Sequence, residues 1–217
     1  MPTYVVLLCP PGAGKGTQAA ILSRQLGLAH VSSGDLFRDN IQRETALGRQ
    51  VKDILARGDL VSDDLAVAMV RDRLGWPDAH AGAVLDGFPR TPGQAEITDR
   101  MLAELGGRVN VALSIEVRQG TLVERIGGRW TCRAKAHIYH EKHAPPKTPG
   151  VCDLDGSELF QRDDQQPEVV SKRHQVYLRD TEPLLEFFRS QGRLAVIDGE
   201  QPIGQVTEAL IAAIPAE

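Results

Sequence analysis

The residues best suited to chemistry form a glycine-rich stretch near the N-terminus, Gly12-Ala13-Gly14-Lys15-Gly16-Thr17. It follows the apolar run Tyr4–Leu8 and precedes a helical pattern, so we expect it to join a buried strand to a helix. Its glycines allow a tight turn in which backbone N–H groups and a helix N-terminus face one anion. Lys15 adds a positive charge, and the Thr17 hydroxyl can reach phosphates or their metal. The stretch predicts a phosphate-binding loop, although Cys9 holds the first glycine position of the common pattern.

A second candidate run, Asp86-Gly87-Phe88-Pro89-Arg90, directly follows the apolar residues 83–85. A carboxylate at that strand end would lie close to Lys15 and could hold Mg²⁺ through water. An aspartate that only caps a helix or turn is the alternative, and the motif that follows Asp86 favours the functional interpretation.

Arginines recur where predicted elements meet. They are Arg38, Arg90, Arg125, Arg129, Arg162 and Arg173. Guanidinium groups suit the neutralisation of a transferring phosphoryl group. No nucleophile–base pair stands out in the sequence, and a phosphate oxygen as acceptor needs positioning rather than a base. The pattern therefore predicts phosphoryl transfer between two phosphate-bearing molecules.

These residues are placed by strands that alternate with helices. Strands are expected at 4–8, 29–31, 83–85, 109–117 and 194–197. Helices are expected from about 16, at 36–41, 47–55, 65–74, 92–105 and 120–126, from 167 to 188 with a bend or break near Pro183, and at 206–214. The order predicts an α/β fold in which helices flank a parallel β-sheet core. Residues 127–165 have no helical period, and short strands are expected there at 129–132 and 137–140.

Composition narrows the class of protein. The 217 residues suit a single domain, and the net charge of −4 argues against a general nucleic-acid or membrane-surface binder. No apolar run approaches the ~20 residues of a membrane span. Three cysteines make no disulfide framework. We therefore expect a cytoplasmic protein that binds neither nucleic acid nor membrane. We also expect a monomer.

The sequence resembles adenylate kinases of the long-lid bacterial type over essentially its whole length. The run 86–90 is the most specific marker, and it is joined by residues 11–17, Ser33-Gly34-Asp35, Gln94, Gly128-Arg129, Tyr139-His140, Pro145-Pro146-Lys147, Arg162 with Asp164, and Ile197-Asp198-Gly199. The resemblance implies a P-loop NTPase-type fold with one kinase domain over 1–217. It also implies a helical AMP-binding subdomain over 32–61 and an inserted lid subdomain over 127–165, with the remainder as the core.

The resemblance also implies roles for individual residues. The catalytic group would be Lys15, Asp86, Arg90, Arg129, Arg162 and Arg173. ATP would contact Gly12, Ala13, Gly14, Lys15, Gly16, Thr17, Arg125, Arg129, Ile138, Tyr139 and Gln201. AMP would contact Ser33, Arg38, Asp59, Leu60, Val61, Gly87, Phe88, Pro89, Arg90, Gln94, Arg162 and Arg173. Gln94 would read the adenine edge, for which an amide offers both a donor and an acceptor.

The function implied is reversible transfer of the terminal phosphoryl group from Mg²⁺·ATP to AMP, giving two ADP. The alternatives are a nucleoside monophosphate kinase with another base preference, such as a UMP/CMP kinase or a GTP-dependent AMP kinase, and an inactive nucleotide sensor. Two further departures from the family pattern stand beside Cys9. Ser33 occupies a common threonine position, and Gln165 occupies a frequent aspartate position, where it is expected to weaken a tie between lid and core.

The last departure is in the lid. In zinc-bearing members of the family, the positions that resemble Cys132, Lys135, Cys152 and Asp155 form a metal site. A protonated lysine has no lone pair for Zn²⁺. Either His137 replaces it as fourth ligand, or Lys135 and Asp155 form an ion pair above two ordinary core thiols. The second alternative is favoured, because a shift of two residues changes the direction and reach of a ligand, and so no metal is expected.

Overall fold

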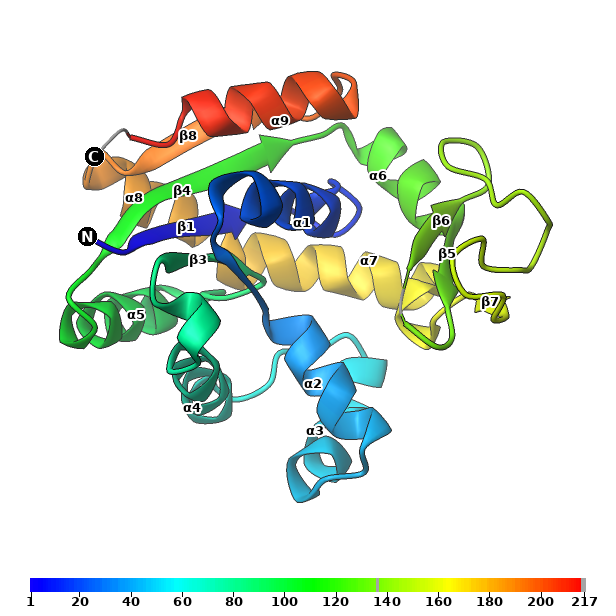
Figure 1. The fold of residues 1–217 in the computed structure, drawn as a ribbon, viewed down its shortest axis with the longest axis horizontal. Coiled ribbons are helices and arrows are strands. Elements are labelled where there is room, and N and C mark those ends of the chain that lie inside the picture. Colours follow the sequence, from blue (N-terminus) through cyan, green and yellow to red (C-terminus); the bar gives the residue numbers. More distant parts are fainter. Residues whose placement is uncertain (136, 216–217) are drawn as a thin grey trace.

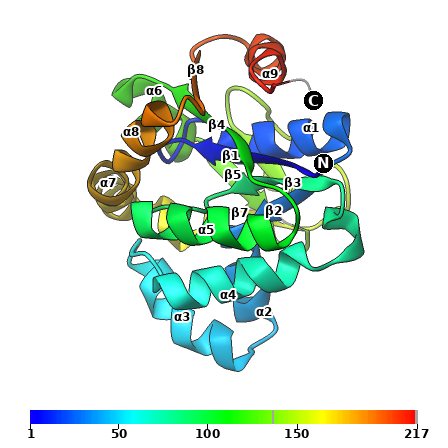
Figure 2. The same cartoon turned by 90° about the vertical axis from the view of Figure 1, so that its left-hand side faces the viewer.

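The computed structural model describes residues 1–135 and 137–215. At its centre lies a parallel five-stranded sheet with the strand order β2-β3-β1-β4-β8. The strands are β1 (Thr3–Leu8), β2 (Ala29–Ser32), β3 (Gly82–Asp86), β4 (Val109–Glu116) and β8 (Leu194–Asp198). Helices cover both faces of this sheet (Figure 2). The predicted fold class, a parallel sheet core of the P-loop NTPase type, is confirmed.

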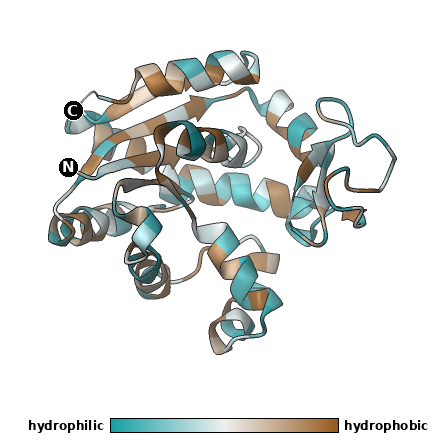
Figure 3. Cartoon of the chain, viewed as in Figure 1, coloured by the Kyte–Doolittle hydropathy of each residue, from teal (hydrophilic) through white to brown (hydrophobic). Residues whose placement is uncertain are grey.

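The two faces of the sheet are buried under different helices. On one face, alternate residues of β1 such as Val5 and Leu7 pack with Leu22 of α1 (Lys15–Leu26) and Leu210 of α9 (Ile203–Ala212). On the other face, Val6 and Leu8 join a second cluster to which α4 (Asp63–Leu74), α5 (Pro92–Glu104) and α8 (Pro183–Ser190) contribute. The strands of this sheet are accordingly largely hydrophobic (Figure 3). Strand β1, buried on both sides, therefore holds the following loop on a rigid base.

Two smaller units extend from the core at separate places (Figure 1). Helices α2 (Ser33–Gln42) and α3 (Ala46–Ala56) form the first, within the predicted AMP-binding segment. Each begins at a hydroxyl cap, since Ser32 Oγ accepts the Asp35 N–H at 3.2 Å and Thr45 Oγ1 accepts the Gly48 N–H at 3.0 Å.

The second unit is an antiparallel sheet in the predicted lid segment, residues 127–165. It follows α6 (Gln119–Gly127) and pairs β5 (Arg129–Cys132) with β6 (Ile138–His140) and β7 (Leu159–Phe160). Cys132, Tyr139, Cys152 and Leu159 form its buried hydrophobic cluster.

The long helix predicted over residues 167–188 is interrupted before Pro183, as expected. Helix α7 (Pro167–Val176) continues into one π-helical turn over Tyr177–Thr181, and α8 begins at Pro183. Because proline cannot donate a backbone hydrogen bond, the regular ladder stops there. Two short 3-10 turns, Pro77–Ala79 and Asp163–Gln165, complete the elements. Within the described residues, every helix is too short or too polar to cross a bilayer.

Candidate active site

The phosphate loop runs from the end of β1 to the start of α1. Gly12 and Gly14 adopt φ values of +90° and +93°, which side chains rarely allow. A Cβ on Gly12 would also lie 2.8 Å from the Leu122 carbonyl oxygen of α6. Gly14 caps α1 without a side-chain hydrogen bond, so the first N–H groups of the helix are left for an anion. Cys9 is buried and lies outside the positive-φ region, and its side chain is therefore accommodated without backbone strain.

Asp86 lies at the end of β3, one strand away from the loop. It is 5% exposed, forms an ion pair with Lys15, and its Oδ2 lies 3.3 Å from His30 Nε2. Burial alone would raise the pKa of Asp86, but the charge of Lys15 and the contact with His30 bring it well below its usual value. The carboxylate therefore stays ionised at neutral pH and holds Lys15 at the mouth of the loop.

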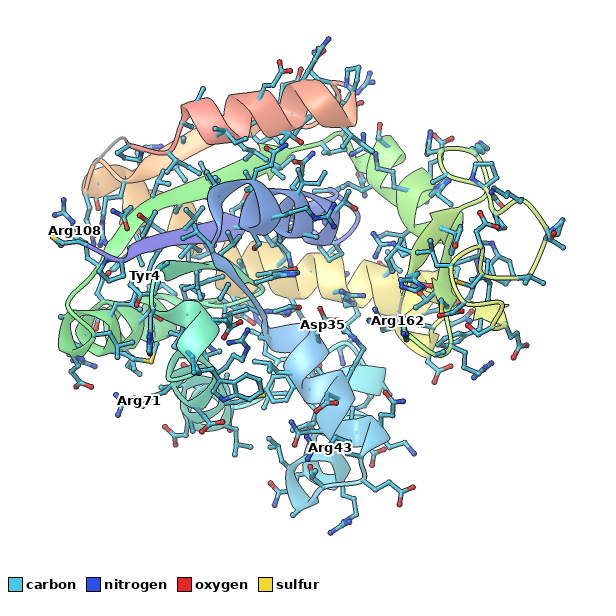
Figure 4. All side chains as sticks on the ribbon, in the orientation of Figure 1. Tyr4, Asp35, Arg43, Arg71, Arg108 and Arg162 are labelled. Atoms are coloured by element: carbon cyan, nitrogen blue, oxygen red, sulfur yellow. The ribbon has the colours of Figure 1, made fainter. Side chains whose placement is uncertain are left out.

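A broad cleft brings most of the predicted cations together. It lies between the phosphate loop, α2 and the lid segment. Lys15, Arg38, Arg90, Arg129, Arg162 and Arg173 line it, together with Gly14, Gly16, Thr17, Asp86 and Ile138. In Figure 4, Asp35 and Arg162 mark the α2 side and the lid side of this cleft.

The electrostatics of the cleft favour an anion. Burial, and then the positive charge of Arg173, lower the pKa of Arg90 to about 10. Burial and then Arg162 lower the pKa of Arg129 to about 10 as well. Both groups are still cationic at neutral pH, so like charges crowd one another in a partly desolvated space. A polyphosphate would relieve that repulsion.

Asp164 is the internal counter-ion of the lid-side arginines. Its Oδ2 accepts hydrogen bonds from Arg162 Nη2 at 2.5 Å and Arg173 Nη1 at 2.9 Å. Gln165 Oε1 accepts the Arg162 N–H at 3.1 Å, so the amide at this position does form a local tie. Asp164 Oδ1, Gln165 Nε2 and Thr131 Oγ1 are buried without a partner, and all three residues line the cleft. Unpaired buried polar atoms there point to a polar ligand.

Residues expected to bind AMP surround Gly87. Its carbonyl oxygen accepts both Ser33 Oγ and Arg90 Nε, each at 2.7 Å. Gly87 has φ +77°, and a Cβ there would meet both of these side chains at 2.9 Å. Leu60 and Pro89 line a smaller pocket, which Lys15 and Arg173 also line. The contact of Ser33 with the Gly87 carbonyl is made by its hydroxyl, a group that threonine at this position would also supply.

Several predicted residues do not line either pocket. Arg125 Nη2 donates to the Gly199 carbonyl at 3.0 Å, and Gln201 Nε2 donates to Asp198 Oδ2 at 2.9 Å. The Tyr139 hydroxyl accepts the Asp153 N–H at 2.8 Å inside the lid unit. The others are Gly12, Ala13, Ser33, Asp59, Val61, Phe88 and Gln94; of these, Ala13, Ser33, Val61, Phe88 and Gln94 are buried and Asp59 pairs with Lys172.

In the lid the structure corrects two expectations. The ion pairs of the described residues include no Lys135–Asp155 contact, and Asp155 Oδ2 instead lies 3.5 Å from His137 Nδ1. The expectation that His137 points away from the two cysteines and Asp155 is also wrong. One donor atom each from Cys132, His137, Cys152 and Asp155 lies within 4.8 Å of the others.

Measured pairs in this cluster include His137 Nδ1 to Cys152 Sγ at 3.3 Å and Cys132 Sγ to Asp155 Oδ2 at 3.2 Å. Ligands of a tetrahedral zinc ion, with bonds of about 2.0–2.3 Å, lie about 3.3–3.8 Å apart. The Lys135 N–H donates to Cys132 Sγ at 3.4 Å, a contact typical of support around a thiolate ligand. The donor set fits Zn²⁺.

Two residues of the site were not singled out from the sequence. His30 lies on β2 and contacts Asp86 across neighbouring strands. Asp63, at the start of α4, accepts Gln94 Nε2 at 2.7 Å. For His30, its place near the carboxyl end of a predicted parallel strand was the available signal. For Asp63 there was none, because the contact depends on how α4 packs against α5.

A phosphate loop at the carboxyl end of a parallel sheet, facing a cleft lined with arginines, defines a nucleotide-binding phosphotransferase of the P-loop class. The family model for adenylate kinase matches residues 7–193. The chain is 46% identical to an adenylate kinase of Streptomyces avermitilis, covering 98% of this chain and 97% of that protein. It is also 46% identical to adenylate kinases of Symbiobacterium thermophilum, with 98% and 99% covered, and of Listeria monocytogenes, with 93% and 94% covered. The chain belongs to the adenylate kinase family and is a kinase.

Proposed function

We propose that this chain transfers the terminal phosphoryl group of ATP to AMP and releases two ADP, in a reversible reaction. The observation that carries the proposal is the single cleft in which Lys15, Arg90, Arg129, Arg162 and Arg173 converge. A phosphate loop bounds it on one side and the α2 unit on the other, which leaves room for a nucleotide from each direction.

Roles follow from these positions. The N–H groups of Gly12–Thr17 and the Lys15 ammonium would hold the phosphates of ATP. Arg90, Arg162 and Arg173 would neutralise the oxygens of the transferring group. Arg129 would reach the triphosphate from the lid segment, and Arg125 would join it after leaving the Gly199 carbonyl. An anionic phosphate oxygen of AMP as the acceptor needs no general base.

Mg²⁺ fits the same cleft. Asp86 is an ionised carboxylate at the strand end, and the cleft also includes Thr17. Asp86 would hold the ion through water, and the Thr17 hydroxyl would complete its contact with the loop. Bound there, Mg²⁺ would offset phosphate charge. In the chain without nucleotide, the ion pair with Asp86 keeps Lys15 beside the phosphate loop, from where it would contact the outer phosphates of ATP.

The lid segment is proposed to carry one zinc ion. Cys132, His137, Cys152 and Asp155 would hold it, with His137 in place of Lys135. Such a closed site of four protein ligands stabilises a small unit and does no chemistry. The unit has few buried residues of its own, so a structural metal would add to its stability.

We also propose a monomer in a reducing cytoplasm, in keeping with the free thiols of Cys9, Cys132 and Cys152. Sedimentation at micromolar concentration tests the monomer, and a dimer would contradict it.

A coupled assay of ADP formation tests the function. With Mg²⁺·ATP as donor, we expect kcat/KM for AMP to exceed the values for UMP, CMP and GMP. Preference for UMP or CMP would favour a kinase of other base preference. Faster transfer to AMP from GTP than from ATP would indicate a GTP-dependent AMP kinase, and absence of transfer would indicate a nucleotide sensor.

A further inference from the structure

The side-chain amide of Gln94 is held at both ends by the protein itself. Gln94 is 2% exposed, and its Oε1 accepts the Arg90 N–H at 2.7 Å. Its Nε2 donates to Asp63 Oδ1, also at 2.7 Å. A backbone N–H can only donate and a carboxylate can only accept, so these two partners fix which end of the amide is oxygen.

Asp63 is itself held in place by a second contact. Its Oδ2 accepts Thr91 Oγ1 at 3.2 Å, and Thr91 Oγ1 accepts the Gln94 N–H at 3.1 Å as the cap of α5. The half-buried carboxylate thus ties the first turn of α4 to the first turn of α5. Both of its oxygens are used, which limits its freedom to follow a rotating amide.

The fixed amide keeps one N–H on Nε2 and one lone pair on Oε1 for a ligand. Adenine presents a ring nitrogen acceptor beside an amino donor on its Watson–Crick edge. Hypoxanthine has the same size, but there a ring N–H donor lies beside a carbonyl acceptor. To read hypoxanthine in the same pose, the Gln94 amide would have to turn over. Its oxygen would then face the Asp63 carboxylate, and its NH₂ would face the Arg90 N–H.

We propose that Asp63 is a specificity-determining positioning residue, which fixes the Gln94 amide so that the acceptor site takes 6-amino purines and rejects 6-oxo purines. Asp63 does not contact the nucleotide and acts through Gln94. This inference rests on the proposed function, in which Gln94 reads the base of AMP.

The test compares kcat/KM for AMP and for inosine monophosphate, which differ only in this donor–acceptor order. In Asp63→Ala we expect the AMP:IMP ratio to fall by about tenfold or more, since the lost contact frees the amide to turn. Asp63→Asn should also lower the ratio, because the asparagine amide can present its NH₂ to a turned Gln94 and so no longer fixes which end of that amide is oxygen. Asp64→Ala, a neighbouring exposed residue in the same helical turn, is the matched control and should leave the ratio unchanged.

A purely structural role for Asp63 would not move the ratio, because it would lower kcat/KM for both nucleotides equally. A double-mutant cycle adds a second readout. With Gln94→Ala already present, Asp63→Ala should change the AMP:IMP ratio no further. If Asp63→Ala is too unstable to assay, Asp63→Leu supplies similar volume without an acceptor and should show the same loss.

An unchanged ratio in Asp63→Ala or Asp63→Leu would overturn the inference and leave the proposed function standing. A wild-type ratio in Asp63→Asn would overturn it too, because the inability of the carboxylate to donate would then be irrelevant. A wild-type chain that does not phosphorylate AMP would instead overturn the proposed function, and the inference with it.

Discussion

Replacing Arg90 with alanine should abolish most of the turnover and leave the fold intact. Arg90 lies four residues after the end of β3 and lines both the cleft and the smaller pocket. Among the residues that the structure describes, its side chain donates only through Nε, to the Gly87 carbonyl, so the terminal nitrogens can meet a phosphoryl group. That carbonyl would still accept Ser33 Oγ in the variant, and the loop would keep one of its two side-chain ties.

The size of the effect follows from the charge. A hydrogen bond to a charged group contributes about 1.5–3 kcal/mol, and a cation aimed at developing charge is stronger still in a water-poor site. Loss of about 2.7 kcal/mol from the transition state corresponds to a roughly 10²-fold fall in kcat.

Stability should respond differently from activity. The pKa of Arg90 is about 10 in the folded chain, below its ordinary value, so at every pH below about 10 the charged form destabilises the folded state. Removing the cation removes the cost of burying its charge and, second, its repulsion with Arg173, so the melting temperature should be unchanged or slightly higher.

The assay is steady-state ADP formation with AMP varied at saturating ATP, combined with thermal melting. Arg189→Ala is the matched control, because Arg189 is exposed and pairs with Glu186 on the outside of α8. A variant that kept its kcat and lost only affinity for AMP would refute the catalytic role and make Arg90 a binding residue.

Three other changes test base reading, the paired carboxylate and the lid. Gln94→Ala should lower the ratios of kcat/KM for AMP over GMP and for AMP over CMP, each by an amount equivalent to about 1–3 kcal/mol. Unchanged ratios would show that Gln94 does not read the base. Folding lowers the pKa of Asp86. Its ion pair with Lys15 therefore stabilises the folded chain fully at pH values above the unfolded pKa of about 4, and stabilises it less as the pH falls below that value. The difference in urea midpoint between wild type and Asp86→Asn should therefore be constant from about pH 8 to 5 and begin to close below about pH 4; a constant difference at pH 3 would contradict this. Purified chain should carry close to one zinc ion, which His137→Ala loses together with several degrees of melting temperature, while the exposed His80→Ala keeps it; a metal-free wild type would count against the zinc site.

The core was predictable because its signals are local. The alternation of short apolar runs with helical periods is enough to indicate a parallel sheet, and the interruption before Pro183 follows from a missing N–H. Because the carboxyl ends of parallel strands meet at one edge of the sheet, residue order alone predicts Asp86 beside Lys15, and the two form an ion pair. These features depend on residue order and on general rules for parallel sheets.

The parts that were not predicted depend on contacts between distant segments. The two-residue offset of His137 from Lys135 argued against His137 as a ligand, yet its Nδ1 lies 3.3 Å from Cys152 Sγ. The contact of Asp63 with Gln94 joins the beginnings of two helices, and it arises only when α4 and α5 pack. Sequence spacing indicates how far apart two side chains lie along one segment, but it does not indicate which side chains of different segments point toward each other.

The fate of a labelled γ-phosphate tests the central claim most directly. The chain is incubated with γ-labelled ATP, Mg²⁺ and unlabelled AMP, and the products are separated at low conversion. The arrangement of cations around one cleft predicts that all transferred label appears as the terminal phosphate of ADP formed from AMP, with one unlabelled ADP for each. Label released as inorganic phosphate, or ADP that stays unlabelled, would contradict direct transfer between the two nucleotides.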